Sequence, residues 1–133
     1  MRHTAREGMT MSVNGLGANA PYSALRANSL RLDVSANNVA NINTDEFKSS
    51  GVATSDLGYI NSIGQGTQVT GTYSNTRPGP VAVSAEGGMT EQSNTDAAVE
   101  ITNQMAARSA YSANTQMART VDDMTQTLID LKR

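Results

Sequence analysis

The side chains that could most readily take part in a reaction are three carboxylates near the end of the chain: Asp122, Asp123 and Asp130. Hydrolytic or general acid–base catalysis needs paired groups that reach one reacting atom. Neighbouring residues on a helix diverge by about 100°, so Asp122 and Asp123 cannot converge in this way. We interpret the three carboxylates as a solvated helix face. A hydrolase that uses Asp122 or Asp123 is the rival interpretation.

Three further patterns resemble chemical sites and fall short of them. Gly64-Gln65-Gly66 begins like a phosphate-binding loop, but Val69 stands where the third Gly belongs. The many Ser and Thr hydroxyls have no activating base except His3, the one His of the chain. There is no Cys, hence no disulfide and no thiolate metal site. The sequence therefore predicts no catalytic residue, no cofactor and no metal.

The composition points instead to a chain that depends on partners. Leu, Ile, Val and Phe number 22 of 133 residues, below the roughly 20% at which a chain struggles to bury a core. A small chain of this kind usually needs disulfides, a metal or other molecules. The ten Lys and Arg are scattered at a net charge of -2, which argues against nucleic acid. No stretch is apolar for the roughly 20 residues of a membrane span, so we expect no membrane insertion.

The distribution of Gly separates two flanks that can form helices from a middle region that cannot. Eight of the eleven Gly lie between residues 51 and 88, and Gly is disfavoured inside helices. The flank before this region predicts a helix that starts near Asn19-Ala20-Pro21 and ends around 41–44. Its candidate seam, a stripe of apolar and small residues at heptad spacing, is Leu25, Ser29, Leu32, Ala36 and Val39.

The flank after residue 92 predicts a longer helix. Ser93 with Asp96 three residues on resembles a capping box, and Lys132 and Arg133 favour the helix C-terminus. The stripe begins at Ala98, Ile101 and Met105 and passes through Ala110 and Ala113. It continues as a regular seam at Met117, Val121, Met124, Leu128 and Leu131.

Between the flanks, 68–73 and 81–83 are rich in β-branched residues and predict a hairpin around the turn 74–80. The expected fold is mainly α, with N- and C-terminal helices in a coiled-coil-like pair and a small irregular β-hairpin region between them. The expected organisation is a flexible segment at 1–20, an N-terminal axial helix at 21–44, a Gly-rich β/loop region at 45–92 and a C-terminal axial helix at 93–133.

The two predicted helices differ in length. A helix of roughly 55 Å paired with one of roughly 30 Å leaves about half of the longer one without an intrachain partner. Self-assembly is the simplest way to cover it.

Two sets of motifs resemble the bacterial flagellar rod, hook and hook-associated axial proteins. Ala24–Ala27 and Leu32–Thr44 are similar to the N-terminal signature of that family. Ser93–Asp96, Arg108–Asn114 and Thr120–Met124 are similar to its C-terminal segment. The resemblance covers roughly 22–50 and 91–133. The short middle is most like the small proximal-rod subunit called rod protein C.

The sequence departs from the family at several positions. The family commonly has Gly before the aromatic that closes the N-terminal signature, where this chain has Glu46 before Phe47, so the path of 43–50 is left open. Thr95 stands where a branched apolar residue is usual, and Ser109 where the family often has a larger side chain. Residues 1–10 precede the expected family start, with Met11 or Met9 as initiator.

The resemblance implies a structural subunit of the proximal rod that assembles into a helical tube with itself and other rod subunits. It implies export by the flagellar type III apparatus without a cleaved signal peptide, and a place in the basal-body rod that crosses the periplasm. A non-polymerising coiled-coil adaptor and another small axial protein of the flagellar export family are the alternatives. The candidate assembly interface combines both seams with Asn residues that would set register between subunits. It comprises Leu25, Leu32, Ala36, Asn37, Asn38, Val39, Asn41, Ile101, Met105, Tyr111, Met117, Val121, Met124, Leu128 and Leu131.

Overall fold

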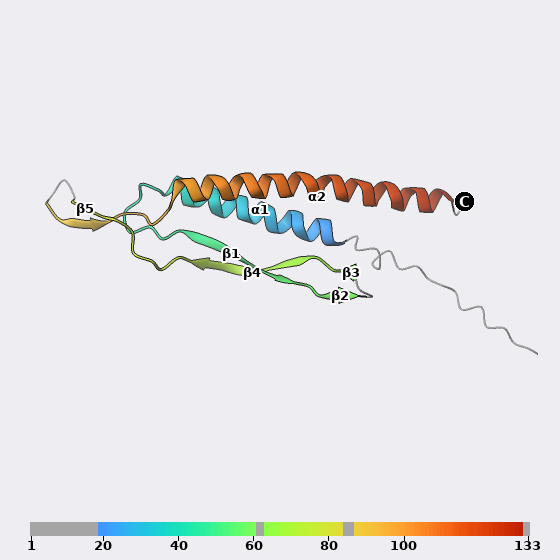
Figure 1. Cartoon of the computed structure of the whole chain (residues 1–133), viewed down its shortest axis with the longest axis horizontal. Helices are drawn as coiled ribbons and strands as arrows, with labels where there is room; N and C mark the ends of the chain where they lie inside the picture. The colour runs from blue at the N-terminus through green and yellow to red at the C-terminus, as the bar shows by residue number, and fades with distance from the viewer. Residues whose placement is uncertain (1–18, 61–62, 84–86, 132–133) are drawn as a thin grey trace, which may run out of the picture.

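The computed structural model describes residues 19–60, 63–83 and 87–131 (Figure 1). Expectations about residues 1–18, Lys132 and Arg133 fall outside this part of the chain. The elements, in chain order, are α1 (Asn19–Ala40), β1 (Ser50–Asp56), β2 (Tyr59–Ile60), β3 (Ile63–Gly64), β4 (Thr67–Ser74), β5 (Val81–Val83), β6 (Met89–Glu91) and α2 (Ala97–Leu131).

The two helices pack antiparallel, and α1 lies between α2 and the strands β1 and β4 (Figure 1). Tyr22 near the start of α1 contacts Asp122 near the end of α2, while Ser35 contacts Glu100 at the opposite end of the pair. Because α2 has 35 residues and α1 has 22, α2 continues past the start of α1. The part beyond the Tyr22 contact is short, so the expectation that half of α2 lacks an intrachain partner is too large.

The start of α2 differs from the predicted capping box. The carboxylate of Asp96 accepts hydrogen bonds from the backbone N–H groups of Ala98 at 2.9 Å and Val99 at 3.3 Å, so Asp96 is the N-cap. Ser93 is buried, and its hydroxyl accepts from the backbone N–H of Thr95 at 3.1 Å. The helix therefore begins three residues later than a Ser93 cap would place it.

The strands form three separate two-stranded antiparallel sheets. The longest pairs β1 with β4, from Ser50 opposite Ser74 to Asp56 opposite Thr67, with a register shift between Ala53 and Thr54. The predicted hairpin of 68–73 with 81–83 is wrong, because β4 pairs with β1 and β5 pairs with β6. Two prolines between β4 and β5 have no N–H to continue a ladder.

The expectation of a mainly α fold is also wrong. The described chain is 53% helical and carries six strands in addition. Two of these strands lack a recognisable pattern in the sequence: β1 is a Ser-, Gly- and Thr-containing segment without a clear period of two, and β6 has three residues. β1 pairs with β4 and β6 pairs with β5. The chain is therefore a two-helix unit with a substantial β component.

The interior of the described chain is small and largely polar. The buried hydrophobic core consists of Ala27, Ala107 and Ala118. Six polar or charged residues are buried with them, namely Asn28, Ser35, Asn38, Ser49, Ser93 and Glu100. Since apolar burial stabilises in proportion to area, three alanines contribute little and the polar contacts carry much of the packing geometry.

The turn after α1 contains a residue in a left-handed conformation. Glu46 has φ 57°, the one non-Gly residue with positive φ in the described chain. Its N–H donates to the carbonyl of Glu91 at 2.8 Å, which fixes the turn against the strand β6. The turn thus keeps a conformation that Gly adopts without cost, at the position where the resemblance leads one to expect Gly.

Candidate assembly surface

The contact between the helices and the sheet is organised by one buried amide. Asn38 is 1% exposed, and its side chain bonds to both neighbouring elements. Its Nδ2 donates to the Ser50 carbonyl at 2.8 Å and to Glu100 Oε1 at 2.9 Å, while its Oδ1 accepts from the Ser50 N–H at 2.8 Å. One side chain therefore fixes the register of α1 against both β1 and α2.

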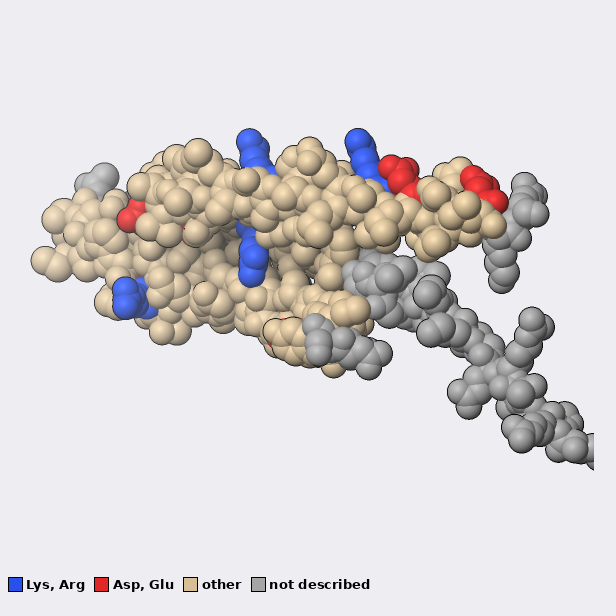
Figure 2. All heavy atoms as spheres, turned by 45° about the vertical axis from the view of Figure 1, so that its right-hand side comes forward, with Lys and Arg blue, Asp and Glu red and all other residues tan. Residues whose placement is uncertain are grey.

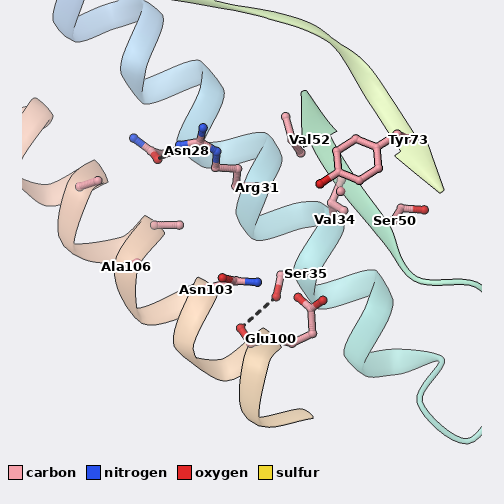
Figure 3. A pocket seen from close by; sticks show the side chains of 13 residues that line it. Asn28, Arg31, Val34, Ser35, Ser50, Val52, Tyr73, Glu100, Asn103 and Ala106 are labelled. Carbon is pink, nitrogen blue, oxygen red and sulfur yellow. Dashed lines mark hydrogen bonds between the residues drawn. The ribbon is translucent and has the colours of Figure 1, made fainter. Parts of the chain in front are cut away.

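Further polar contacts continue along the same face of α1 (Figure 3). The Ser35 hydroxyl donates to the backbone carbonyl of Glu100 at 3.2 Å. Arg31 donates to Asn28 Oδ1 at 3.3 Å and to Thr54 Oγ1 at 3.2 Å, so its guanidinium bridges α1 and β1. The helix pair is held by hydrogen bonds at positions where a coiled coil would place Leu or Val.

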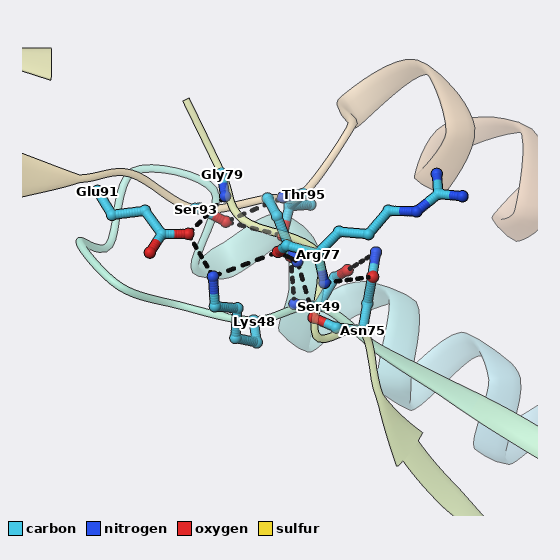
Figure 4. Close-up of polar contacts among 9 residues, drawn as sticks. Lys48, Ser49, Asn75, Arg77, Gly79, Glu91, Ser93 and Thr95 are labelled. Atoms are coloured by element: carbon cyan, nitrogen blue, oxygen red, sulfur yellow. Dashed lines mark hydrogen bonds and ion pairs between the residues drawn. The ribbon is translucent and has the colours of Figure 1, made fainter. Parts of the chain in front are cut away.

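A second polar junction joins the three segments that meet beyond the end of α1 (Figure 4). The Asn94 amide accepts from the Ser49 N–H at 2.7 Å and donates to the carbonyls of Asn75 and Arg77, both at 2.8 Å. The Asn75 N–H donates in turn to the Ser49 carbonyl at 2.7 Å. These bonds fix where the chain leaves β4 and where it approaches α2.

An ion pair closes this junction. The ammonium of Lys48 bonds to the carboxylate of Glu91, which also accepts from the Gly79 N–H at 2.5 Å. The Lys48 hydrogen bond, followed by that of Gly79, lowers the pKa of Glu91 below its ordinary value of 4.5. The pair is partly exposed, so its role is mainly to position the segments that it joins.

One flank of α2 presents apolar side chains that α1 does not cover. At spacings of three, four and seven residues it comprises Val99, Ala106, Ala110, Ala113, Met117, Val121, Met124, Leu128 and Leu131, and we call this set the α2 flank. Its large side chains are highly exposed, from 50% for Leu128 to 79% for Leu131, apart from the half-buried Val121. No member carries a charge, and most of the face in Figure 2 is likewise uncharged.

The α2 flank borders a groove whose floor is α1 and whose opposite wall is β1 with β4. The groove contains a central cavity of about 420 Å³, between Asn28 and Val34 on the floor, Ala106 and Ala110 on α2, and Tyr73 on β4 (Figure 3). A cavity of about 340 Å³ follows at the start of α1, lined by Ala24, Gly66, Met117 and Val121 among others. The flank is therefore open to a partner along its length.

The residues of the predicted interface fall into three groups by exposure. On α1, Asn38 is buried, Ala36 and Asn37 are exposed, and Leu25, Leu32 and Val39 are half-buried, as is Asn41 just after the helix. On α2, Val121 is half-buried, and the exposed ones are Ile101, Met105, Tyr111, Met117, Met124, Leu128 and Leu131. Ile101 and Met105 lie on the side of α2 away from the groove, whereas Met117 to Leu131 share the α2 flank.

The helix–helix contact is offset from the predicted seams by about one residue: earlier on α1 and in the first part of α2, and later from Asn114 on. The buried and half-buried positions that α2 turns to α1 include Glu100, Gln104, Ala107, Asn114 and Ala118. An apolar-periodicity argument misses Asn28, Ser35 and Glu100 because their side chains are polar. A heptad of small and amide residues in both helices is the one sequence signal that could have found them.

The three carboxylates near the end of α2 lie at its surface. Asp122 accepts a hydrogen bond from the Tyr22 hydroxyl at 2.9 Å, and Asp123 and Asp130 are exposed. No group of three or more His, Asp or Glu side chains gathers as a metal site within 19–60, 63–83 and 87–131. Over the same residues, no helix has the length and hydropathy that a membrane span requires.

Two family models match the chain, one on each helix. The family described as "Flagella basal body rod protein" matches residues 21–48, which contain most of α1 and the Glu46 turn. The family described as "Flagellar basal body rod FlgEFG protein C-terminal" matches residues 86–131, which contain α2. No curated protein matches the chain.

Together the two matches cover more than half of the 133 residues, and the chain belongs to the flagellar basal-body rod family. The family resemblance predicted from the terminal motifs is thus confirmed. Domains of this family are structural and not enzymatic. Membership implies a place in the flagellar basal body and assembly with other components of the rod.

Proposed function

We propose that this chain is a structural subunit of the proximal rod, most like rod protein C, and that it is not an enzyme. The matches to rod families at both ends support this proposal, as does the small region of short strands between the helices. The buried amide of Asn38 and the amide of Asn94 bond to other segments of the chain and so serve its packing. The rod role is therefore mechanical: the subunit transmits torque through its packed helices.

The subunit assembles with itself and with other rod proteins through its helices. The observation that carries this proposal is the α2 flank, where Met117, Met124, Leu128 and Leu131 are each at least half exposed. Contiguous exposed apolar surface of this kind marks an interaction site in a soluble chain. The half-buried Leu25, Leu32 and Val39 on α1 supply further apolar side chains to the proposed interface. Asn37 and Asn41, at the end of α1, set register between subunits, whereas Asn38 sets it within the chain.

The route and location follow from the same family assignment. The chain passes through the flagellar type III export apparatus without a cleaved signal peptide and joins the part of the rod that crosses the periplasm. A weakly apolar interior supports this route, because a chain with three buried hydrophobic residues in its described part unfolds readily for passage through a narrow channel. The alternative is an adaptor that docks on one partner and never polymerises.

A deletion strain complemented with variants tests assembly directly. Met124→Asp places a charge on the exposed α2 flank, where Met124 is 55% exposed and makes no core contact. We expect this variant to be exported yet absent from isolated basal bodies, because assembly would bury an unpaired charge. Gln126→Asp, two residues along and about 160° around α2 from Met124, is the matched control at an exposed position and should assemble.

The proposal fails if a strain without this chain builds normal basal bodies, which is the outcome an adaptor predicts. It also fails if the Met124→Asp variant is incorporated as well as the control. A purified variant with unchanged circular dichroism excludes loss of folding as the reason for failed incorporation.

A further inference from the structure

A buried carboxylate near the start of α2 has no opposite charge beside it. Glu100 is 8% exposed, and the one ion pair among residues 19–60, 63–83 and 87–131 joins Lys48 to Glu91. A carboxylate that is removed from water is costly unless an opposite charge pairs with it. We propose that the Glu100 carboxylate is the docking site for an arginine side chain of another rod component. This inference rests on the proposed function.

The free side of this carboxylate faces the central cavity of about 420 Å³ (Figure 3). One oxygen of Glu100 accepts from Asn38 Nδ2 at 2.9 Å, which is the one hydrogen bond that the described residues donate to the carboxylate. No buried side-chain oxygen of the described chain lacks a partner, so the second oxygen is the one open to the cavity. The negative charge therefore faces a space that a group from outside the chain can enter.

The cavity has the room and the entrance that a long side chain needs. Its volume is many times the roughly 30 Å³ that one water molecule occupies in the liquid. Glu100, Asn103 and Tyr73 also line a wider groove of about 1110 Å³, which extends to the turn at 75–80. Asn103 is exposed where the two spaces meet. The groove thus leads from the surface of the molecule to the carboxylate.

The lining favours a guanidinium group over an ammonium group. Tyr73 is 60% exposed, and a guanidinium can stack on such a ring while it donates to a carboxylate. The Asn103 side chain adds an amide oxygen as a further acceptor. Arg31, the other charged residue of the lining, donates to Thr54 and forms no salt bridge with Glu100 in the described chain.

The source of the arginine follows from the assembly in which the chain takes part. Membership of the rod family implies contact with other rod components, so we assign the arginine to one of these and not to a second copy. A charge pair of this kind contributes orientation and specificity as well as affinity, because the wrong neighbour leaves Glu100 buried without a counter-charge.

Glu100→Gln removes the charge and keeps the internal contact, because a Gln side-chain oxygen still accepts from Asn38. In purified protein the urea midpoint of this variant should not fall below that of the unsubstituted chain. In the complemented deletion strain its amount in isolated basal bodies should fall by about tenfold or more, since the partner's arginine would be buried unpaired. Asp123→Asn, which neutralises an exposed carboxylate of the same helix, is the matched control and should be incorporated normally.

Asn103→Arg supplies the opposite charge from within the chain. Position 103 lies one helical turn after Glu100 and lines the same cavity, so the new guanidinium can reach the carboxylate. This variant should keep its urea midpoint and still be incorporated about tenfold less, because the site is already occupied. Thr102→Arg adds the same charge at an exposed position that lines neither space, and it should be incorporated normally. If Glu100→Gln unfolds the chain, Asn103→Arg decides the matter.

A photoreactive phenylalanine analogue in place of Val99 identifies the partner. Val99 is 52% exposed and lines the wider groove beside Glu100. Irradiated basal bodies should yield a crosslink to a different rod protein, within a peptide that contains Arg.

The amount of the unsubstituted chain in basal bodies separates the two proposals. Its absence overturns the proposed function. When it is present, normal incorporation of Asn103→Arg or of a folded Glu100→Gln overturns the inference and leaves the rod role standing. A crosslink to a second copy alone, a crosslink to a peptide without Arg, or no crosslink also overturns the inference.

Discussion

Replacing Asn38 with Ala removes three hydrogen bonds from the point where α1, β1 and α2 meet. Two of them join the amide to the Ser50 backbone and one joins it to the Glu100 carboxylate. Each neutral bond contributes about 1 kcal/mol net and a bond to a charged group about 1.5–3 kcal/mol. The higher helix propensity of Ala returns about 0.5 kcal/mol. The free energy of unfolding should therefore fall by about 3–4.5 kcal/mol.

Urea unfolding followed by circular dichroism at 222 nm measures this change. At a slope of about 1.5 kcal/mol per molar urea, the midpoint should fall by about 2–3 M. Trimethylamine N-oxide in the buffer favours the folded state and keeps a folded baseline for both proteins. If the variant shows no folded baseline even without urea, its loss of stability is larger than expected, which also agrees with the prediction.

Asn37→Ala is the matched control for this experiment. Asn37 is the preceding residue on the same helix, and it is exposed where Asn38 is buried. Surface substitutions of this kind usually change stability by no more than about 0.5 kcal/mol. If Asn38→Ala shifts the midpoint no more than Asn37→Ala does, the buried amide does not fix the three elements and our account of the fold is refuted.

Three other substitutions test single features of the structure. Glu46→Gly relieves a left-handed residue and should raise the free energy of unfolding by about 1 kcal/mol in the same urea assay; a loss of stability would contradict the strain. Glu91 has a lowered pKa, so its ion pair with Lys48 stabilises above pH 4.5 and is lost as the pH falls below that value. Glu91→Gln should therefore reduce the fall in urea midpoint between pH 5 and pH 3, and an unchanged fall would exclude this pair as a contributor. The hydrogen bond to Asp122 raises the pKa of Tyr22 above 10, so in Asp122→Asn an ultraviolet titration should show a Tyr that ionises at lower pH, whereas identical titrations would contradict the contact.

The helices could be predicted from the sequence because their determinants are local. Both lie in flanks free of Gly, and α1 ends just before Asn41, whose side-chain amide donates to the Asn37 carbonyl. Which positions of each helix face the other helix could not be predicted from the spacing of apolar residues. The positions that pack are occupied by Ala, Asn, Ser and Glu, whose hydrogen bonds become visible only when the partner helix is in place.

The pairing of the strands depends on contacts that are distant in sequence. Ser49 and Ser50 are held by Asn94 and Asn38, and these amides together place β1 beside β4 rather than leaving β4 to pair with β5. Neither amide shows an alternation or turn pattern that would announce this role. The path of 43–50 could likewise not be predicted from the sequence, because Glu46 adopts a left-handed conformation that its residue type disfavours.

Polar contacts in this chain determine its geometry, whereas apolar side chains supply stability when they are buried. The polar side chains of the interior fix the arrangement of the elements through hydrogen bonds, as Asn38, Asn94 and Glu100 do. In the described chain every buried side-chain N or O atom has a hydrogen-bond partner. Such contacts specify one arrangement but add modest net stability, since each replaces a bond to water. Many large apolar side chains, which would stabilise the chain far more by burial, remain exposed, several of them on the α2 flank. A rod subunit built in this way has a defined shape before it meets a partner and gains most of its stability only on assembly.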